Sequence, residues 1–256
     1  MSALEIVEVG PRDGYQGIGP FIPTERKIAL LEQLAGAGLT RIEIGSFVSA
    51  SALPQMRDTA EILAACARLP AVRPQVLVPS ERRGRDAVEA GARCLVFVLS
   101  VSEAHNRNNV RRSPEESAQE YERLLAAIPA DVAIRLDLAT SFDCPFEGRI
   151  PEETTLALLD RLVKAKPEAE ICLCDTTGRA DPHHVSSLFG KARARLPGVA
   201  LAFHAHDTYG LGTANVYAAY EAGVRVMDAA VAGLGDRKST RLNSSHSGES
   251  RMPSSA

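Results

Sequence analysis

Short apolar runs alternate with longer stretches of mixed polarity along most of this chain. The short runs are rich in Val, Ile and Leu, as buried parallel strands are. The longer stretches repeat their apolar residues at helical spacing. This pattern predicts strands at residues 5–10, 41–46, 74–78, 94–100, 131–139, 171–175, 199–207 and 225–232. It predicts helices at residues 25–37, 56–68, 81–90, 114–127, 151–165, 182–196 and 213–222.

Capping residues mark the ends of several predicted helices. Thr24 is expected to cap the helix over residues 25–37, and Gly38 to close it in the position just past its last turn. Ser113 followed by Pro114 is typical of a helix start, with the serine as N-cap and the proline at the first helical position.

The alternation of strand and helix determines the predicted fold. Eight strands in this rhythm, in a chain of 256 residues, predict a closed (β/α)8 TIM barrel. An open, doubly wound α/β sheet with helices on both faces is the alternative.

The pattern breaks at residue 236. Residues 236–256 have almost no apolar side chains and no periodicity, which predicts a disordered tail. We therefore expect one barrel domain over residues 1–235, with its last helix missing, and a separate tail over residues 236–256. The stretch DRKSTRLNSSH resembles a translated sequencing adapter, so we interpret the tail as an artefact of a truncated read.

Composition narrows the class of protein. Net charge is only −3 with both signs interspersed, which argues against nucleic-acid or membrane-surface partners. No apolar run has the length of a transmembrane helix, and the first strand begins too early for a signal or transit peptide. Five scattered cysteines fit neither a disulfide framework nor a zinc site. We therefore expect a cytoplasmic protein.

Polar side chains gather where five of the predicted strands end. His204 and His206 stand two residues apart after an apolar run, so both point to the same face of their strand. The other residues of this kind are Arg12 and Asp13 after the first strand, Glu43 in the second, Arg135 and Asp137 in the fifth, and Asp175 in the sixth. The C-terminal ends of barrel strands meet at one rim, where active sites lie. We therefore expect these residues to surround one site.

Each residue alone also has an ordinary structural interpretation. Arg12-Asp13-Gly14 can be a tight turn, Glu43 can pair with Arg12 or Arg41, and Arg135 can pair with Asp137. Asp175 can belong to a turn after its strand, and Cys172 and Cys174 to buried strand packing. The coincidence of so many at one rim favours function.

A carboxylate and two imidazoles form a candidate metal site. Asp13, His204 and His206 give a mixed oxygen and nitrogen set that leaves positions open for water and substrate. Mg²⁺ or Mn²⁺ suits this set better than Ca²⁺, which prefers more oxygens.

Six motifs together resemble one family. In chain order they are VGPRDGYQ (residues 9–16), IEIGSFVS (42–49), CPFEG (144–148), DTTG (175–178), HAHDTYG (204–210) and AVAGLG (230–235). Their combination is similar to 3-hydroxy-3-methylglutaryl-CoA lyases, which are metal-dependent TIM-barrel enzymes. The resemblance spans residues 6–235.

The resemblance implies a retro-Claisen cleavage of 3-hydroxy-3-methylglutaryl-CoA, or of a close 3-hydroxyacyl-CoA, to acetyl-CoA and acetoacetate. It implies that Asp13, His204 and His206 bind the metal and that Arg12 stabilises the enolate oxygen. Glu43 would be a catalytic residue that orients Arg12 and the metal-bound water, and His204 would also be a proton shuttle. Substrate contacts are expected from Arg12, Gln16, Arg135, Asp137 and Asp175. Members of the family are often homodimers.

Two departures from the family pattern affect the expected activity. Asp137 stands where these lyases have a tyrosine, so the acyl group can differ from 3-hydroxy-3-methylglutaryl. The family also has a Gly-Cys-Pro catalytic cysteine and a Gly-Asn metal ligand after the Gly-Leu-Gly stretch, and neither follows Gly235. We therefore expect the chain as given to have little or no lyase activity.

Two other functions fit the same residues. One is a Claisen-type synthase or a 2-oxo-acid aldolase of the same superfamily. The other is a non-catalytic remnant that binds metal or CoA.

Overall fold

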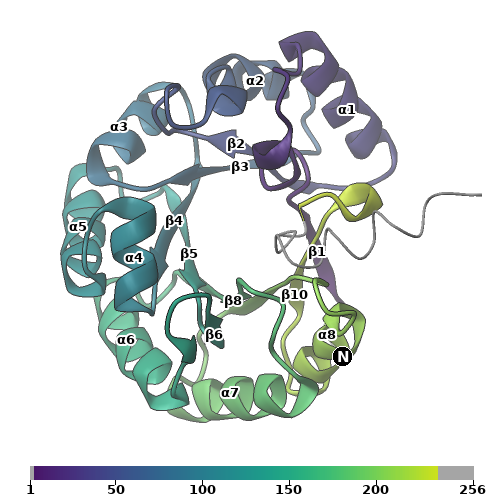
Figure 1. Cartoon of the computed structure of the whole chain (residues 1–256). Coiled ribbons are helices and arrows are strands. Elements are labelled where there is room, and N and C mark those ends of the chain that lie inside the picture. The colour runs from purple at the N-terminus through teal and green to yellow at the C-terminus, as the bar shows by residue number, and fades with distance from the viewer. Residues whose placement is uncertain (1–2, 236–256) are drawn as a thin grey trace, which may run out of the picture.

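Eight parallel strands close into a barrel in the computed structural model, which describes residues 3–235 (Figure 1). The strands are β1 (Glu5–Glu8), β2 (Arg41–Ser46), β3 (Arg73–Val78), β4 (Cys94–Ser100), β5 (Ala133–Ala139), β8 (Glu170–Asp175), β9 (Leu201–Ala205) and β10 (Val226–Ala229). They pair in the order β1-β10-β9-β8-β5-β4-β3-β2, and β1 also pairs with β2. The predicted TIM barrel is confirmed, and the open sheet is excluded.

Helices surround the barrel on its outside (Figure 1). They are α1 (Thr24–Gly36), α2 (Thr59–Ala65), α3 (Glu81–Glu89), α4 (Glu103–Val110), α5 (Pro114–Ala127), α6 (Glu152–Ala165), α7 (Pro182–Arg195) and α8 (Gly212–Glu221). Within residues 3–235, β10 is followed only by the 3-10 turn η4 (Val231–Gly233). The predicted tail over residues 236–256, and with it the proposed domain boundary, lies outside the described residues.

The apolar pattern located every barrel strand but missed two local features. Helix α4 follows β4 directly, and its polar sequence EAHNRNNV has no helical repeat of apolar residues. A small hairpin of β6 (Asp143–Cys144) and β7 (Gly148–Arg149) follows β5. The predicted helix over residues 56–68 is divided into α2 and two 3-10 turns, η2 (Pro54–Met56) and η3 (Cys66–Arg68).

The capping predictions had mixed outcomes. Ser113 is the N-cap of α5 and forms a capping box with Glu116, as a Ser-Pro-Glu-Glu sequence favours. Gly38 follows α1 with a φ of +91°, as a glycine just past a helix end should. The prediction for Thr24 is wrong, because α1 begins at Thr24 itself, after Pro23, and no side chain caps it.

The two faces of each strand meet different surroundings. Leu173 and Phe203 point outward into the main apolar core between strands and helices. Cys172, Cys174 and Ala202 point into the barrel, where they form a small separate cluster. The interpretation of the two cysteines as buried strand packing is therefore confirmed.

The barrel interior also holds a network of buried charges. Arg135 is fully buried, and its guanidinium donates to Asp137 (2.7 Å), Asp228 (2.6 Å) and Glu170 (3.4 Å). Glu170 also pairs with Arg41. Three carboxylates around one buried guanidinium satisfy the hydrogen bonds that a buried charge requires.

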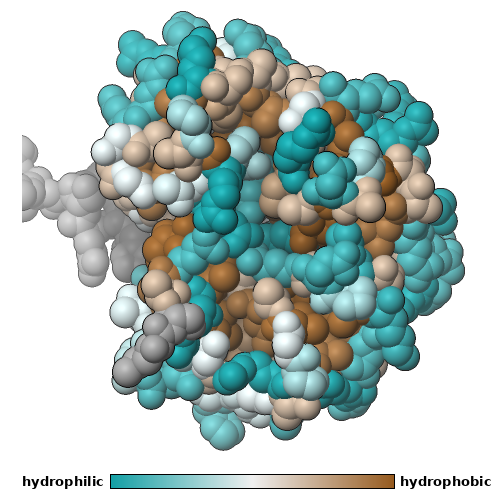
Figure 2. Space-filling model, turned by 180° about the vertical axis from the view of Figure 1, so that it is seen from behind, coloured by the Kyte–Doolittle hydropathy of each residue, from teal (hydrophilic) through white to brown (hydrophobic). Residues whose placement is uncertain are grey.

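A hollow opens at the N-terminal ends of the strands, where this network ends. Figure 2 shows it in the centre of that face, with hydrophilic side chains inside and apolar groups around it. It measures about 740 Å³, and Arg41, Gln75 and Arg135 are among its lining residues.

Gly84 lets α3 approach its neighbours closely. A Cβ at this position would lie 2.2 Å from Leu124 Cδ1 of α5, so any side chain displaces a buried leucine. We expect Gly84→Ala to lower the free energy of unfolding by about 1–3 kcal/mol in urea titrations. Gly36→Ala is the matched control, because nothing lies within 4 Å of its Cβ. Equal stability of the two variants would contradict this account of the packing.

Candidate active site

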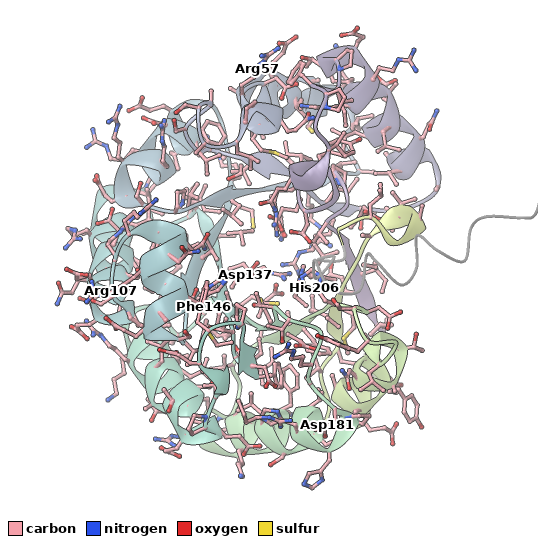
Figure 3. The ribbon with its side chains drawn as sticks, viewed as in Figure 1. Arg57, Arg107, Asp137, Phe146, Asp181 and His206 are labelled. Carbon is pink, nitrogen blue, oxygen red and sulfur yellow. The ribbon has the colours of Figure 1, made fainter. Side chains whose placement is uncertain are left out.

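A cavity of about 660 Å³ opens at the C-terminal ends of the strands. Of the residues predicted from sequence, Arg12, Asp13, Gln16, Asp137, His204 and His206 line it. Figure 3 shows Asp137 and His206 pointing into the barrel centre from different sides, while Arg57 and Asp181 lie toward the periphery. Glu43, Arg135 and Asp175 are buried behind the cavity wall.

The loop after β1 presents Asp13 toward the cavity. The backbone N–H groups of Arg12 and Asp13 both donate to the Val9 carbonyl, which forms a tight turn. Asp13 Oδ1 accepts hydrogen bonds from Arg12 Nη1 (2.7 Å) and Gln16 Nε2 (2.9 Å). This turn packs against the end of the described chain, where a Cβ on Gly235 would lie 2.8 Å from Asp13 Oδ2. The glycine is needed for that close approach.

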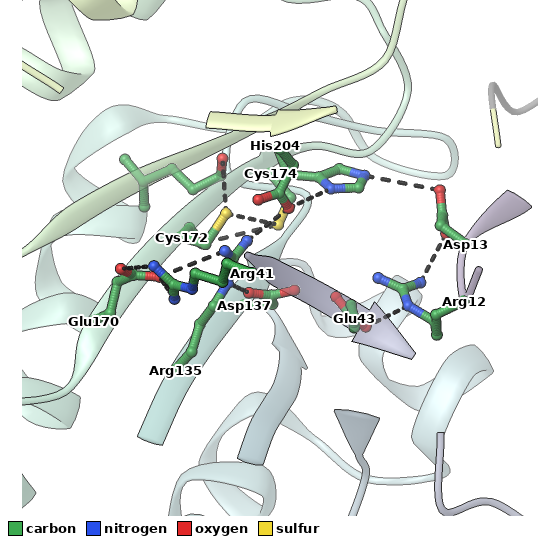
Figure 4. A network of polar contacts seen from close by, with 12 residues as sticks. Arg12, Asp13, Arg41, Glu43, Arg135, Asp137, Glu170, Cys172, Cys174 and His204 are labelled. Atoms are coloured by element: carbon green, nitrogen blue, oxygen red, sulfur yellow. Dashed lines mark hydrogen bonds and ion pairs between the residues drawn. The ribbon is translucent and has the colours of Figure 1, made fainter. Parts of the chain in front are cut away.

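Three side chains meet as an Asp-His-His cluster, formed by Asp13, His204 and His206. His204 Nε2 lies 3.3 Å from His206 Nε2 and 3.9 Å from Asp13 Oδ2. Figure 4 shows the His204 ring turned toward Asp13 across the cavity. One ligand atom from each residue lies within 4.8 Å of the others.

The distance between the two imidazole nitrogens is close to that in a divalent-cation site, while Asp13 Oδ2 lies somewhat farther from His204. Ligand atoms about 2.1 Å from one cation, at right angles to one another, lie about 3 Å apart. Two imidazole nitrogens that face each other at 3.3 Å also need a proton or a cation between their lone pairs. The cluster therefore suits a metal with one carboxylate and two imidazole ligands.

Asp228 orients His204 and was missed by the sequence analysis. His204 Nδ1 lies 2.8 Å from Asp228 Oδ2, and Arg135 holds the same oxygen from below. Burial by itself would lower the pKa of His204 and raise the pKa of Asp228, but the attraction between opposite charges outweighs burial for both groups. The pKa of metal-free His204 rises to about 10, and the pKa of Asp228 falls to about 2, with Arg135 as its strongest stabilising partner. Asp228 could have been found by its inward position on the strand of residues 225–232.

Arg12 lies beside Asp13 and is fixed by Glu43 (Figure 4). Arg12 Nε donates to Glu43 Oε1 and Nη1 donates to Asp13, while Nη2 has no hydrogen-bond partner among residues 3–235. Glu43 is fully buried, and burial raises the pKa of its carboxyl despite the guanidinium. Of the two partners considered for Glu43, the structure selects Arg12, because Arg41 pairs with Glu170 and Glu5.

Asp175 stabilises a loop from behind the cavity wall. Its carboxylate accepts the backbone N–H groups of Arg179 and Ala180, each at 3.1 Å. The neighbouring Thr176, not Asp175, lines the cavity. Burial is the main cause that raises the pKa of Asp175 from 3.8 to about 6.

This raised pKa predicts a pH dependence of stability. Because its pKa is higher in the folded than in the unfolded chain, Asp175 favours folding most at low pH, and this contribution disappears as pH rises from about 4 to 6. The difference in unfolding free energy between the parent chain and Asp175→Asn should therefore fall by about 2 kcal/mol from pH 4 to pH 7. Urea titrations at both pH values measure it, and a constant difference would contradict the prediction.

The outer part of the cavity is cationic, which sequence reasoning also missed. Arg83, Arg111 and Arg112 line it together with Asn108 and Asn109. All except Arg83 lie on or just after α4, the helix that the apolar pattern did not reveal. Arg111 ends that helix with a φ of +61°.

Taken together, fold and site define a TIM-barrel enzyme with a candidate metal centre at the strand ends. A family model described as HMGL-like matches residues 3–240. The chain is 38% identical to hydroxymethylglutaryl-CoA lyase of Pseudomonas mevalonii over 236 residues, which cover 92% of this chain and 78% of that protein. It is 38% identical to the mitochondrial enzyme of Homo sapiens, over 91% of this chain and 71% of that protein. The chain belongs to the HMGL-like family, and the resemblance is confirmed.

Solved structures agree with this assignment. The HMG-CoA lyase of Acinetobacter baumannii, in complex with coenzyme A and 3-methylmalate, has a TM-score of 0.87 and 37% identity, over 93% of this chain and 78% of that one. The HMG-CoA lyase of Brucella melitensis has a TM-score of 0.86 and 35% identity, over 92% and 83%. Among the helices described within residues 3–235, none is long and apolar enough to span a membrane.

Proposed function

We propose that this chain is a metal-dependent carbon–carbon lyase that cleaves 3-hydroxy-3-methylglutaryl-CoA to acetyl-CoA and acetoacetate, or a close 3-hydroxyacyl-CoA to acetyl-CoA and the corresponding carbonyl compound. The observation that carries the proposal is the meeting of the Asp-His-His cluster with Arg12 in one cavity. Relatives that are named hydroxymethylglutaryl-CoA lyases support it.

Asp13, His204 and His206 would hold Mg²⁺ or Mn²⁺. Such an ion, when bound, supplies Lewis acidity that lowers the pKa of the substrate's C3 hydroxyl. Asp228 keeps the Nδ1 proton of His204 in place, so that Nε2 faces the ligand position. Without metal, His204 holds a proton at this atom, so proton and cation compete for it.

Arg12 and Glu43 would stabilise the departing fragment. Loss of the hydroxyl proton and cleavage of the C2–C3 bond leave acetoacetate and the enolate of acetyl-CoA, which a proton then neutralises. Nη2 of Arg12, which has no hydrogen-bond partner in the described part of the chain, can donate to the thioester oxygen, where the enolate charge develops. Glu43 fixes the guanidinium plane before substrate binds, so no reorganisation is needed during the reaction.

The cationic outer part of the cavity would receive the coenzyme. Arg83, Arg111 and Arg112 offer charge and hydrogen-bond donors that suit the phosphates of CoA. A solved relative is in complex with coenzyme A, which supports an acyl-CoA substrate. The matched relatives include cytoplasmic and mitochondrial enzymes, and the five free cysteines of this chain fit a reducing compartment such as the cytoplasm.

The direct test is an assay of the purified chain with Mn²⁺ or Mg²⁺. It uses panels of 3-hydroxyacyl-CoA thioesters and 2-oxo acids, and it detects acetyl-CoA and acetoacetate. Slow cleavage of the thioesters is the expected result. Turnover of 2-oxo acids alone would instead favour a synthase or an aldolase.

A second protein tests whether residues after Gly235 limit the rate. Residues 236–256 contain no Gly-Cys-Pro sequence, so we propose that the chain as given turns over slowly. Replacing them with the corresponding segment of the Pseudomonas mevalonii enzyme should raise kcat strongly. A normal enzymatic rate without this graft would refute the expectation of low activity, and no cleavage by either protein would refute the proposed function.

A further inference from the structure

Only one of the two carboxylate oxygens of Asp137 accepts a hydrogen bond within residues 3–235. Its Oδ1 accepts the Nε–H of Arg135 at 2.7 Å. Its Oδ2 has no hydrogen-bond partner among residues 3–235, yet the side chain lines the cavity and is 5% exposed. Figure 4 shows the carboxylate between Arg135 and Glu43, inside the ring of strands.

Beyond Arg135, the neighbouring strands offer this carboxylate no strong hydrogen-bond donor, and the charges of Arg12 and Glu43 act on it without a hydrogen bond. Val98 on β4 and Cys172 on β8 are its partners in the sheet register. Ala139, the next residue of β5 that faces inward, lines the cavity above it, and Cys174 lines the cavity beside it. None of these side chains can donate a strong hydrogen bond to Oδ2.

Arg135 holds the carboxylate rigidly in place. The guanidinium is fully buried and is itself fixed by Asp228 and Glu170. Asp137 therefore cannot turn away when a ligand enters. A ligand atom beside Oδ2 must donate a hydrogen bond, because a second acceptor there would be repelled and an apolar group would leave a desolvated carboxylate oxygen unpaired.

Asp137 faces the position of the acyl group. It lies on β5, which is opposite β1 in the closed order of eight strands. The Asp-His-His cluster and Arg12 come from β9 and from the loop after β1, so an acyl group held there extends toward β5.

We propose that Asp137 selects acyl-CoA thioesters in which a group that ends in a hydroxyl replaces the C3 methyl. The hydroxyl would donate a hydrogen bond to Asp137, which a plain methyl cannot do. This inference rests on the proposed function, because it takes the acyl chain of a thioester as the ligand. It deepens that function by naming the class of substituent that the chain prefers.

Asp137→Asn is the most informative variant. Arg135 Nε donates to the side-chain oxygen, so the asparagine must place its carbonyl on Arg135 and its NH₂ toward the cavity. The substitution thus changes the atom that faces the acyl group from an acceptor to a donor while it preserves shape. Asp131→Asn makes the same chemical change at an exposed position ahead of β5 and is the matched control.

Calorimetric titration of the chain loaded with Mg²⁺ tests the proposal, because the slow turnover expected of this chain leaves the thioesters intact during the titration. The probes are 3-hydroxy-3-methylglutaryl-CoA and its analogue with hydroxymethyl in place of the C3 methyl. The parent chain and Asp131→Asn should bind the hydroxymethyl analogue about 10-fold more tightly. Asp137→Asn should lose that preference and bind the methyl compound as the parent does.

Two results would overturn the proposal. One is equal binding of the two thioesters, or no binding of either, by the parent chain, which needs no variant to be interpreted. The other is a preference that persists in Asp137→Asn. The cleavage assay with Mn²⁺ separates this from the proposed function: cleavage without the binding preference leaves the lyase function intact, and the preference without cleavage leaves the selectivity of Asp137 intact.

Discussion

His206→Ala and Asp13→Asn are each expected to weaken Mn²⁺ binding by about 100-fold or more. Loss of a group that only hydrogen-bonds to a metal ligand typically weakens metal binding by about 10–100-fold, and loss of a ligand itself should cost at least as much. His206 and Asp13 approach His204 from two sides, and each contributes one ligand atom to the cluster. Mn²⁺ titrations followed by calorimetry or electron paramagnetic resonance measure the loss directly, whether or not the chain turns over substrate. His183→Ala, at an exposed position of α7, is the control for removal of an imidazole.

A second group of side chains is the alternative metal site, and it defines the result that would contradict this prediction. Asp137, Cys172 and Cys174 also bring one ligand atom each within 4.8 Å of one another. Arg135 lies against Asp137, and its positive charge opposes a cation there. If Mn²⁺ affinity survived in His206→Ala and fell in Cys174→Ser, the metal would belong to this second group and the assignment of the Asp-His-His cluster would be wrong.

The sequence predicted the barrel because its physical signals are local. A strand buried on both faces needs a continuous apolar run, as in CLVFVLS of β4. Alternation along a strand then decides which residues point inward, so His204 and His206 could be assigned to one face before their surroundings were known. Ile42 and Ile44 alternate with Glu43 in the same way and pack in the main apolar core.

The features that could not be predicted depend on side-chain contacts that only the folded barrel forms. Glu43 had two possible arginine partners, and the choice depends on contacts that the sequence does not show: Arg41 is bound by Glu5 and Glu170, so Arg12 pairs with Glu43. Asp228 was overlooked because its function comes from His204 on the neighbouring strand and from Arg135 across the barrel. Asp175 was predicted to contact substrate, but its oxygens are used by the backbone of the following loop. Helix α4 carries no apolar repeat because its polar face lines the cavity.

Arg12→Gln should lower kcat for thioester cleavage by about 10²–10³-fold, which is the usual cost of losing one donor to a developing oxyanion. The substitution removes the Nη2 donor and the charge, and it leaves Glu43 buried without a counter-ion. KM should change little, because the interaction strengthens only as negative charge grows on the thioester oxygen. Steady-state assays on the chain with the grafted C-terminal segment give the rates if the parent rate is below detection.

Two further variants separate this catalytic contribution from simple attraction of an anionic substrate. Arg12→Lys keeps the positive charge but cannot bind Glu43 and the thioester oxygen with one planar group, so kcat should stay low. Arg83→Gln removes a cation from the outer part of the cavity, where CoA phosphates would bind, so it should raise KM and leave kcat nearly unchanged. If Arg12→Lys restored full kcat, or if Arg12→Gln raised only KM, Arg12 would act as a general attractor of negative charge and not as the stabiliser of the enolate.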